Sequence, residues 1–281
     1  MRNQIDSVVE DFGEEWERFP QNNLTDLDHI GQFNSYFHIF PWDKVNKKSV
    51  GADIGCGSGR WASLVAPKIG HLHLVDPSSK ALQVAKSNLK SFKNISFSHK
   101  SVDELNFKNN SLDFAYCLGV LHHIPDTLAG IKAISHKLKP GAPFLIYLYY
   151  AFDNRPLWFR IIWRISDFIR KIVSNLPTKL KHFICDILAF VVYLPFVKIG
   201  CILRYFNILP KNWPLKYYLE NSLYVLRTDA LDRFGTKLEK RFTKSQIQKM
   251  LLTCGFHSIK FSKFIPHWCA IAIKGDINID I

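Results

Sequence analysis

Short apolar runs alternate with longer helix-like segments over the first half of the chain. We expect strands at the apolar runs 50–54, 71–75, 95–98, 112–117 and 143–149. The spacing of apolar positions between these runs predicts helices that begin at Arg60 and that cover Ser79–Phe92 and Thr127–Leu138. Strands separated by helices form a parallel sheet with right-handed crossovers. The pattern therefore predicts an α/β core over residues 46–150.

The alternation resumes at the C-terminal end of the chain, within residues 241–281. Lys244–Leu252 reads as a helix, and the segments 258–262 and 268–274 read as two further strands. We expect this part to complete the core sheet. Residues 1–45 form a helical lead that is rich in aromatic side chains, and it either covers a bound cofactor as a flap or packs on the sheet.

An insertion over residues 151–240 separates the two parts of the core. Pro156–Leu176 reads as a helix with proline in its first turn, and Arg160, Arg164, Asp167 and Lys171 recur on one face of it. Trp, Phe and Ile fill most of the remaining positions. Such a helix is typical of a membrane interface, but it also suits a lid that packs on its own domain. Both interpretations stay open.

Phe183–Leu203 is more apolar still, yet it contains Asp186, Pro195 and Lys198. A membrane-spanning helix needs about 20 nearly uncharged residues, so we do not expect a span here. A hydrophobic helical hairpin remains. It would cover an apolar acceptor, dip into a bilayer surface through residues 156–205, or form a dimer contact.

Composition favours a globular intracellular protein with an uneven charge. Of 281 residues, 47% are apolar and 22% are charged, which excludes a disordered chain. The net charge is +13, but residues 1–40 hold two basic and eight acidic side chains, whereas 151–220 hold eleven basic and four acidic ones. The basic segment favours an anionic partner, or it is simply a solvated face.

Six scattered cysteines without a C-x-x-C pair indicate neither a zinc site nor disulfides. No secretory pattern opens the chain, so we expect a cytoplasmic location.

The segment Val50–Trp61 carries the clearest chemical signal. A strand ends at Asp53, and Gly55, Gly57 and Gly59 follow at alternate positions before a helical pattern. Glycines tolerate positive φ and let a ligand approach the backbone, and a helix N-terminus offers unpaired N–H groups to an anion. The spacing fits neither the dinucleotide motif nor the phosphate-binding loop with its Lys-Ser/Thr pair.

Asp76 ends the next predicted strand, 23 residues after Asp53. An acidic side chain at this distance from a glycine turn can accept hydrogen bonds from ribose hydroxyls. Ligands of parallel sheets bind beyond the carboxyl ends of the strands. Asp53, Asp76, the segment 101–103 and the segment 118–123 all fall at those ends.

These motifs together resemble the class I S-adenosylmethionine (SAM)-dependent methyltransferases. The resemblance covers about 50–150 and resumes over 241–275. It implies an α/β fold with a Rossmann-like, seven-stranded, mostly parallel sheet, helices on both faces and, in this chain, a helical hydrophobic insertion. It also implies SAM as cofactor, held by Asp53, Gly55, Gly57, Gly59, Asp76, Ser101, Val102, Asp103 and Leu118. In many relatives an Asp stands where this chain has Ser101, so Asp103 or the backbone at Val102 would take over the adenine contact.

Methyl transfer needs alignment of two reactants and, for a hydroxyl acceptor, a base. His122 and His123, just past the fourth strand, are the base candidates, and each could instead only pack or cap a turn. Tyr149 could line the acceptor pocket. Asp153, Asp232, Arg233, Glu239 and Arg241 are candidates for binding a polar acceptor, although the charged run 229–243 also suits a solvated loop that ends at a cap, Thr243 or Ser245. The resemblance requires no metal.

We therefore predict a SAM-dependent methyltransferase that acts on a small molecule, of lipid-linked, glycan or other amphipathic type. The basic insertion also allows an RNA methyltransferase, but its charges lie among Ile and Phe rather than in a polar groove, so nucleic acid is disfavoured. A non-catalytic SAM-binding scaffold at a membrane is the alternative of a different class. Peripheral membrane contact and homo-oligomerisation stay open.

Overall fold

The chain divides into two compact units in a computed structural model that describes residues 2–22 and 24–276. Of these, 2–21, 30–151 and 238–276 belong to the first unit. The second unit takes in 22, 24–29 and 152–237. Residues 152–237 of the second unit lie within the segment 151–240 that the sequence analysis separates as an insertion.

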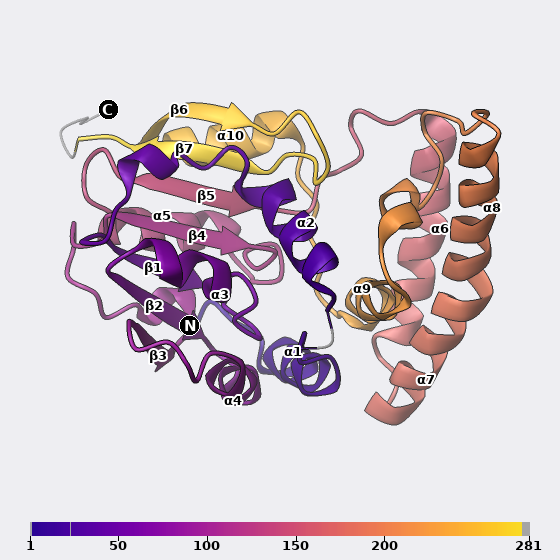
Figure 1. Cartoon of the computed structure of the whole chain (residues 1–281), viewed down its shortest axis with the longest axis horizontal. Coiled ribbons are helices and arrows are strands. Elements are labelled where there is room, and N and C mark those ends of the chain that lie inside the picture. The colour runs from indigo at the N-terminus through magenta and orange to yellow at the C-terminus, as the bar shows by residue number, and fades with distance from the viewer. Residues whose placement is uncertain (1, 23, 277–281) are drawn as a thin grey trace. The chain divides into compact units, whose positions relative to one another are not determined.

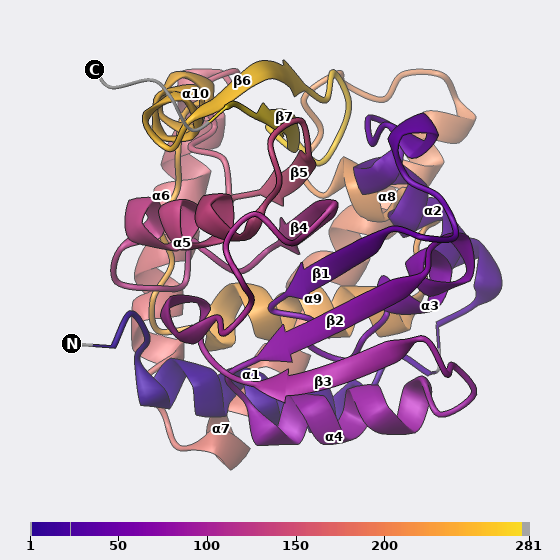
Figure 2. The same cartoon turned by 90° about the vertical axis from the view of Figure 1, so that its left-hand side faces the viewer.

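One seven-stranded sheet organises the first unit, in the order β3-β2-β1-β4-β5-β7-β6 (Figure 2). The strands are β1 (Val50–Ile54), β2 (His71–Asp76), β3 (Ile95–His99), β4 (Phe114–Leu118), β5 (Pro143–Tyr147), β6 (Phe256–Phe261) and β7 (Ala270–Lys274). Neighbours among β1 to β5 pair in parallel, whereas β7 is antiparallel to both β5 and β6. The predicted Rossmann-like, mostly parallel sheet is confirmed.

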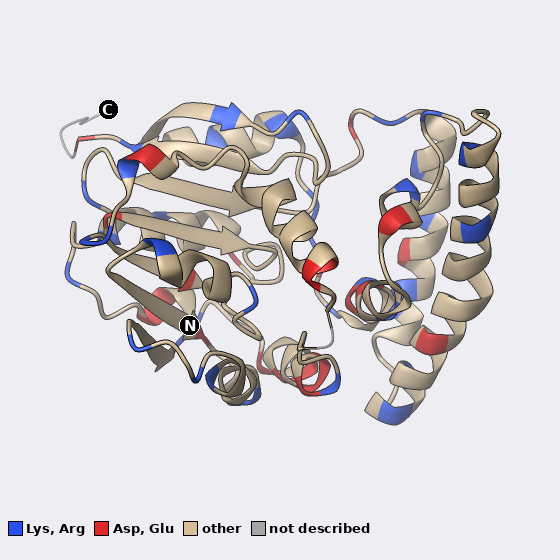
Figure 3. Ribbon diagram, viewed as in Figure 1, with Lys and Arg blue, Asp and Glu red and all other residues tan. Residues whose placement is uncertain are grey.

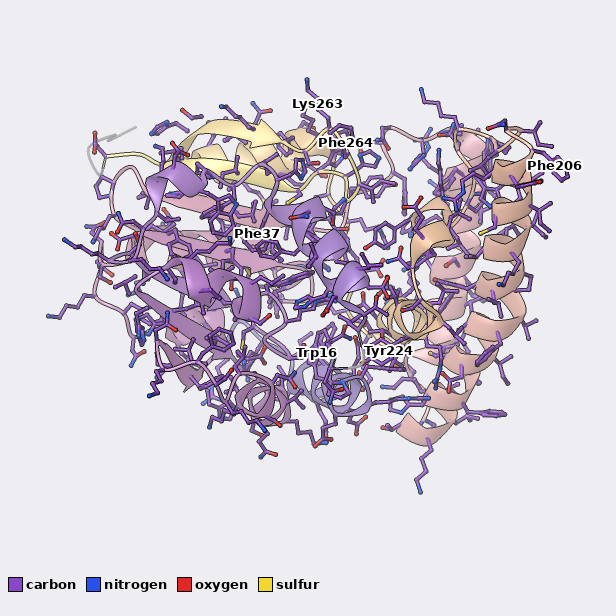
Figure 4. All side chains as sticks on the ribbon, in the orientation of Figure 1. Trp16, Phe37, Phe206, Tyr224, Lys263 and Phe264 are labelled. Atoms are coloured by element: carbon purple, nitrogen blue, oxygen red, sulfur yellow. The ribbon has the colours of Figure 1, made fainter. Side chains whose placement is uncertain are left out.

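Apolar cores lie on both faces of this sheet because its central strands are buried on both sides. On one face α5 (Thr127–Lys137) and α10 (Lys244–Thr253) pack on the sheet. On the other face lie α3 (Ala62–Val65), α4 (Ser79–Asn88) and the C-terminal part of α2 (Asp26–Phe37) (Figure 1). Phe37 of α2 is buried edge-on against Tyr116 of β4, with ring centroids 5.2 Å apart (Figure 4).

Three short 3₁₀ turns complete the connections of the first unit: η1 (Trp42–Lys44), η2 (Ala66–Lys68) and η3 (Val102–Glu104). The helix predicted from Arg60 is correspondingly short. It ends at Val65 and continues as η2, since Pro67 has no N–H to donate to an α-helical ladder. The helix predicted over Ser79–Phe92 likewise ends early, at Asn88.

Helix α1 (Asp6–Arg18) lies beside α4. Gly13 allows this close approach, because a Cβ at that position would stand 2.5 Å from Ser78 Oγ. A salt bridge between Lys80 and Glu17 joins the two helices, and Asn88 donates a hydrogen bond to the Pro20 carbonyl. The N-terminal segment is therefore fixed at the edge of the sheet where β1 and β2 end.

The second unit is helical. Its elements are α6 (Leu157–Val173), α7 (Thr178–Leu188), the π-helical turn η4 (Ala189–Tyr193), α8 (Leu194–Tyr205), the 3₁₀ turn η5 (Lys216–Glu220) and α9 (Leu223–Gly235). α9 packs against α6 and α7, and its apolar side chains are largely buried. Buried Arg170 of α6 donates to the carbonyls of Thr236 and Lys237 at the end of α9, while Arg227 of α9 pairs with Asp186 of α7.

The apolar run Phe183–Leu203 lies in one continuous helical segment, Thr178–Tyr205, in which the π-helical turn accommodates Pro195 at the start of α8. The first part of the charged run 229–243 is not a loop but the last turns of α9. Thr243 does cap the following helix: its hydroxyl accepts a hydrogen bond from the Gln246 N–H.

The continuous segment Thr178–Tyr205 is 28 residues long and, by length and composition alone, apolar enough to cross a membrane. Only 22% of its most apolar window is buried within the protein. Core helices of soluble proteins satisfy the same criterion, so a single such segment is weak support for a span.

Candidate active site

A tight turn between β1 and α3 forms the floor of the site. Gly55, Gly57 and Gly59 all have positive φ, at +77°, +52° and +75°. A Cβ on Gly55 would stand 2.3 Å from the Val120 side chain, and one on Gly57 would stand 2.8 Å from the Trp16 indole. Both positions therefore require glycine for conformation and for space.

Gly59 has a different role from the other two glycines. A Cβ there would stand 2.7 Å from Leu89, so this glycine brings the turn close to the residues that follow α4. It does not line the cavity described below. Of the three predicted glycine contacts, only Gly55 and Gly57 reach that cavity.

Asp76 stands at the end of β2, facing the glycine turn. One of its carboxylate oxygens accepts the Gly57 N–H at 2.9 Å, and the other accepts the Ser78 N–H at 2.8 Å. Burial raises the pKa of Asp76 to about 6, and the two backbone donors oppose this rise. Each carboxylate oxygen keeps a second lone pair for a ligand.

A cavity opens between the carboxyl ends of β1, β2 and β4 and the inner face of α1. The strand side contributes the glycine turn, Asp76 and the segments after β3 and β4, and α1 with the residues before it contributes an apolar wall. The lining residues are Asn3, Gln4, Ile5, Val8, Val9, Phe12, Trp16, Ile54, Gly55, Gly57, Val75, Asp76, Pro77, Ser78, Lys100, Ser101, Val102, Leu118, Gly119, Val120, His123 and Ile124. All of them belong to the first unit.

Asn3 fastens the N-terminal segment over this cavity. Its side-chain amide donates to the Asp126 carbonyl at 2.7 Å, and its side-chain oxygen accepts the Asp126 N–H, also at 2.7 Å. Its backbone N–H donates to the Asp103 carboxylate at 3.1 Å. Farther along α1, Trp16 lies next to Gly57 and to the Arg60 guanidinium (Figure 4).

The segment after β3 supplies one end of the cavity. Ser101 and Val102 line it, as the sequence suggests. Asp103 does not: its carboxylate accepts hydrogen bonds from Ser101 Oγ and from the Asn3 backbone, so it holds this turn to the N-terminal segment. Burial alone would raise the pKa of Asp103, but the bonds from Ser101 and Asn3, together with the charge of Arg2, hold it below its usual value.

The opposite end of the cavity is formed by the segment after β4. Leu118 and Gly119 line it, and Gly119 has φ of +78°. A Cβ at Gly119 would meet no atom within 4 Å, so this backbone borders open space within the cavity. Sequence analysis singled out Leu118 but not Gly119.

Asp53 lies beneath the floor rather than in the cavity wall. It is paired in register with Tyr116 of β4 and is buried, and its Oδ2 atom has no hydrogen-bond partner within the described part of the chain. Burial raises the pKa of Asp53 to about 8, with the charge of Asp76 acting in the same direction. The Tyr116 hydroxyl and Arg60 lower it in part.

The rings of the three predicted catalytic side chains form one cluster, which we call the ring cluster. The ring centroid of His122 lies 3.8 Å from that of Tyr149, which stacks on it, and 4.0 Å from that of His123, which is tilted by 52°. His123 also lies edge-on to Tyr149, with centroids 5.5 Å apart. His123 in turn lies 4.8 Å from Phe12 of α1. Of these three side chains only His123 lines the cavity, and His122 and Tyr149 lie behind it.

The two histidines differ in their surroundings. His122 is fully buried, and neither of its ring nitrogens has a hydrogen-bond partner among the described residues. Burial holds the pKa of His122 well below its usual value, and the charges of His123 and Arg241 act in the same direction. His123 Nδ1 lies 2.6 Å from the Leu238 carbonyl. Because a carbonyl only accepts, Nδ1 carries the proton, and in the neutral ring Nε2 is then the basic nitrogen.

The five predicted acceptor-binding residues separate into two groups. Glu239 and Arg241 belong to the first unit and form an ion pair at 2.7 Å. They lie near the ring cluster, since the Arg241 guanidinium is 5.0 Å from the centre of the Tyr149 ring. Asp153, Asp232 and Arg233 belong to the second unit.

Arg233 and Asp232 make local contacts within the second unit. The side chain of Arg233 donates to Ser166 Oγ of α6 at 3.2 Å, and the Asp232 carbonyl accepts from the Thr236 hydroxyl. Asp153 is exposed. The structure therefore does not bring the five residues into one site within either unit.

Several cavity residues carry no motif and escaped the sequence analysis. Asn3, Val8 and Lys100 belong to this group, although the aromatic residues Phe12 and Trp16 marked the N-terminal lead as a possible flap. No group of three or more His, Cys, Asp or Glu side chains within residues 2–22 and 24–276 is placed to hold a metal ion.

The cavity fits SAM. The outer lone pairs of Asp76 face the place where ribose hydroxyls would lie, and the open space at Gly119 gives a ligand access to the backbone. The uncharged Ser101 and Val102 line one end of the cavity, and the residues after β4 line the other end.

Comparisons with known proteins agree with this geometry. Residues 52–141 match a family described as a methyltransferase domain. A demethylmenaquinone methyltransferase of Staphylococcus epidermidis is 25% identical over 184 residues, which cover 64% of this chain and 74% of that protein.

Solved structures show the same fold. A SAM-dependent methyltransferase from Thermotoga maritima aligns over 96% of this chain and 100% of its own, with a TM-score of 0.50 and 12% identity. A Bacillus halodurans protein assigned to the methyltransferases aligns over 82% of this chain and 71% of its own, with a TM-score of 0.51 and 13% identity.

Proposed function

We propose that this chain is a class I SAM-dependent methyltransferase and that it methylates a small molecule with an apolar body at the His123 end of its cavity. The observation that carries the proposal is the single cavity that joins the glycine turn and Asp76 to His123. The relatives' name supports an acceptor of this class, since demethylmenaquinone is itself a small molecule. The apolar wall supplied by Ile5, Val8 and Phe12 also favours an apolar acceptor.

Each candidate cofactor-binding residue would contact a different part of SAM. Asp76 would accept hydrogen bonds from the ribose, and the backbone of Gly55 and Gly57 would lie against the ligand. Ser101 and Val102 would border the adenine, while the backbone at Leu118 and Gly119 would face the amino-acid part. Asp53 would act from below: the positive charges of bound SAM would favour its ionised form, which burial disfavours in the empty site.

Helix α1 would serve as the cover of the occupied site. Its inner face lines the cavity, and the Asn3 bonds hold its start in place. A cover excludes water and aligns the reactants, which is where most of the acceleration of a methyl transfer originates.

When bound, SAM supplies a methyl carbon on a positively charged sulfur, which becomes a neutral thioether as the methyl group leaves. His123 Nε2 would take the proton of an acceptor hydroxyl as the new carbon–oxygen bond forms. The Leu238 carbonyl would hold the ring in the required tautomer and orientation. His122 lies next to His123, and burial keeps its ring neutral, so it would add no competing positive charge.

The acceptor class is tested by incubating the purified chain with methyl-labelled SAM and fractionated cell extract. We expect label in the small-molecule or lipid-soluble fraction. Label confined to RNA would contradict the proposal and support the alternative of an RNA methyltransferase.

A second experiment tests His123. Replacing His123 by Gln keeps a polar side chain but removes the base, so we expect kcat to fall by about a hundredfold or more while the Kd for SAM changes only a few-fold. His257→Gln is the matched control, because His257 is exposed on β6 and away from the cavity. A His123→Gln variant with full kcat would exclude the role of base.

A further inference from the structure

The helices of the second unit expose an unusual amount of apolar surface. On α6, seven large apolar side chains are exposed, and their spacing of three or four residues puts them on one face of the helix. They are Leu157, Trp158, Ile161, Ile162, Ile165, Phe168 and Ile172. Phe168, at 67%, is the most exposed of them. We call these seven residues the α6 face.

The continuous segment Thr178–Tyr205 presents a second such surface. Its packed side is formed by Lys181, Cys185, Ala189, Tyr193 and Val197, which are buried. Large exposed side chains occupy the remaining positions and continue past its end: Leu180, Phe183, Ile187, Phe190, Val191, Val192, Phe196, Ile199, Ile202, Tyr205, Phe206 and Ile208. Phe206, just beyond α8, projects into solvent (Figure 4). Single exposed apolar residues are normal on soluble proteins, but contiguous apolar patches are rare. These two patches therefore call for a partner that covers them.

Positive charge borders both apolar surfaces (Figure 3). Arg160 and Arg164 of α6, four residues apart, lie on a stripe next to the α6 face, since residues at this spacing are neighbours on a helix. Lys179 and Lys198 are exposed on the Thr178–Tyr205 segment. Within the described part of the chain these four form no ion pair, whereas Lys171 and Arg204 pair with Asp167 and Glu220.

We propose that the second unit binds the interface of an anionic lipid bilayer through the α6 face and the exposed side of Thr178–Tyr205. Burial of these side chains at the boundary between headgroups and acyl chains removes apolar surface from water. The unpaired arginine and lysine side chains gain attraction to anionic headgroups at the same time. Trp158 and Tyr205 suit the headgroup level, where amphipathic rings concentrate.

Charge distinguishes this occupant from a second copy of the chain. In a two-fold symmetric contact the same surface meets itself. The segment 151–220 carries eleven basic and four acidic side chains, so such a contact would bring like charges together. An anionic surface is complementary to the same feature. This proposal goes beyond the methyltransferase function and does not depend on the acceptor.

The test uses the full chain and vesicles of phosphatidylcholine, with or without about one third phosphatidylglycerol. We expect co-sedimentation with the anionic vesicles, at least tenfold weaker binding to neutral ones, and release by high salt. Failure to bind anionic vesicles would overturn the proposal. Binding that resists both high salt and alkaline carbonate would overturn it in favour of an inserted span.

Matched variants locate the surface. Ile165→Glu with Phe168→Glu should abolish vesicle binding, whereas Leu128→Glu with Leu252→Glu, the same change at exposed positions of α5 and α10, should leave it unchanged. Equal binding by both double variants would overturn the assignment. Far-ultraviolet circular dichroism checks that each variant keeps its helices, because SAM binding would report on the first unit alone, whose residues line the cavity.

A second pair of variants tests the charges. Arg160→Gln with Arg164→Gln should weaken binding to anionic vesicles by about 25-fold, since each basic side chain near the surface contributes about fivefold. Lys132→Gln with Lys249→Gln, at exposed positions of the first unit, is the control. A different result would identify a second copy of the chain as the occupant. In that result the chain does not bind vesicles, and light scattering shows a dimer that Ile165→Glu with Phe168→Glu disrupts.

Discussion

At the scale of the residue, Asp76 illustrates how one carboxylate serves the turn and the ligand together. Both of its oxygens accept backbone N–H groups, from Gly57 and Ser78, and these bonds orient the outer lone pairs toward the cavity. An asparagine would keep the shape, but its NH₂ group would face one of the two backbone donors. The geometry therefore requires Asp rather than its amide.

We predict that Asp76→Ala raises the Kd for SAM by about tenfold to a hundredfold, because two hydrogen bonds to a charged group are lost. Titration calorimetry measures this change. An analogue without the ribose hydroxyls supplies the control, since Asp76→Ala should not weaken its binding further. If the variant loses as much affinity for the analogue as for SAM, Asp76 does not bind the ribose.

Asp53 gives the apo protein a pH dependence of known sign. Its pKa is about 8 in the folded chain but about 3.9 in an unfolded chain, so the folded state holds the proton more tightly. The free energy of unfolding must then fall as the pH rises from about 4 to 8. Asp76, with a pKa of about 6, acts in the same direction over the lower part of that range.

We predict that Asp53→Asn removes much of the loss of stability between pH 6 and 8 in the absence of ligand. Denaturant unfolding at both pH values measures the effect, which should be on the order of a few kcal/mol at pH 8. Asp43→Asn, at an exposed position of η1, should follow the unsubstituted chain. Parallel stability curves for Asp53→Asn and the unsubstituted chain would show that Asp53 is ionised in the folded state.

At the scale of the element, the sequence is informative where chemistry and pattern coincide. The run that ends at Asp53 and the glycines after it predict a strand and a turn, because apolar residues must be buried and positive φ demands glycine. The sequence is much less informative for Thr178–Tyr205. Pro195 suggests that a helix ends there, but the helix continues through a π-helical turn that accommodates the proline. The role of Asn3 was not predictable, because its partners lie 100 and 123 residues away.

Helix α1 provides the prediction at this scale. Replacing Asn3 by Ala removes both side-chain bonds to Asp126, which fasten the start of the cover. We expect SAM to dissociate about tenfold faster, given about 0.5–1.5 kcal/mol for each bond. Stopped-flow displacement measures the rate. Glu10→Ala, at an exposed position of the same helix, should leave it unchanged, and equal rates for both variants would exclude α1 as a cover.

At the scale of the whole molecule, ligand binding and surface chemistry are assigned to different units. The cavity uses only residues of the first unit, and the exposed apolar helices belong to the second. Composition alone indicated the basic, apolar insertion, but it could not assign Glu239 and Arg241 to one unit and Asp232 and Arg233 to the other, because these residues are close neighbours in sequence.

We predict that saturating SAM slows hydrogen–deuterium exchange in α1, in the turn after β1 and in the segment after β4, while α6 and α8 are unaffected. A ligand stabilises only the conformations that contain its site, by about 2.7 kcal/mol at a concentration of 100 times Kd. Anionic vesicles should give the reverse pattern. Slower exchange in α6 and α8 on addition of SAM alone would show that the units are coupled.

The pairing of β5 with β7 has a consequence for synthesis of the protein. On the ribosome β5 emerges more than a hundred residues before its antiparallel neighbour, since Ile146 pairs with Ala270. Strands β1 to β5 can therefore pair while the border of β5 that β7 will occupy is still open and the apolar helices of the second unit are being translated. An open strand border favours mispairing, so the nascent chain is exposed to that risk until β7 has been made.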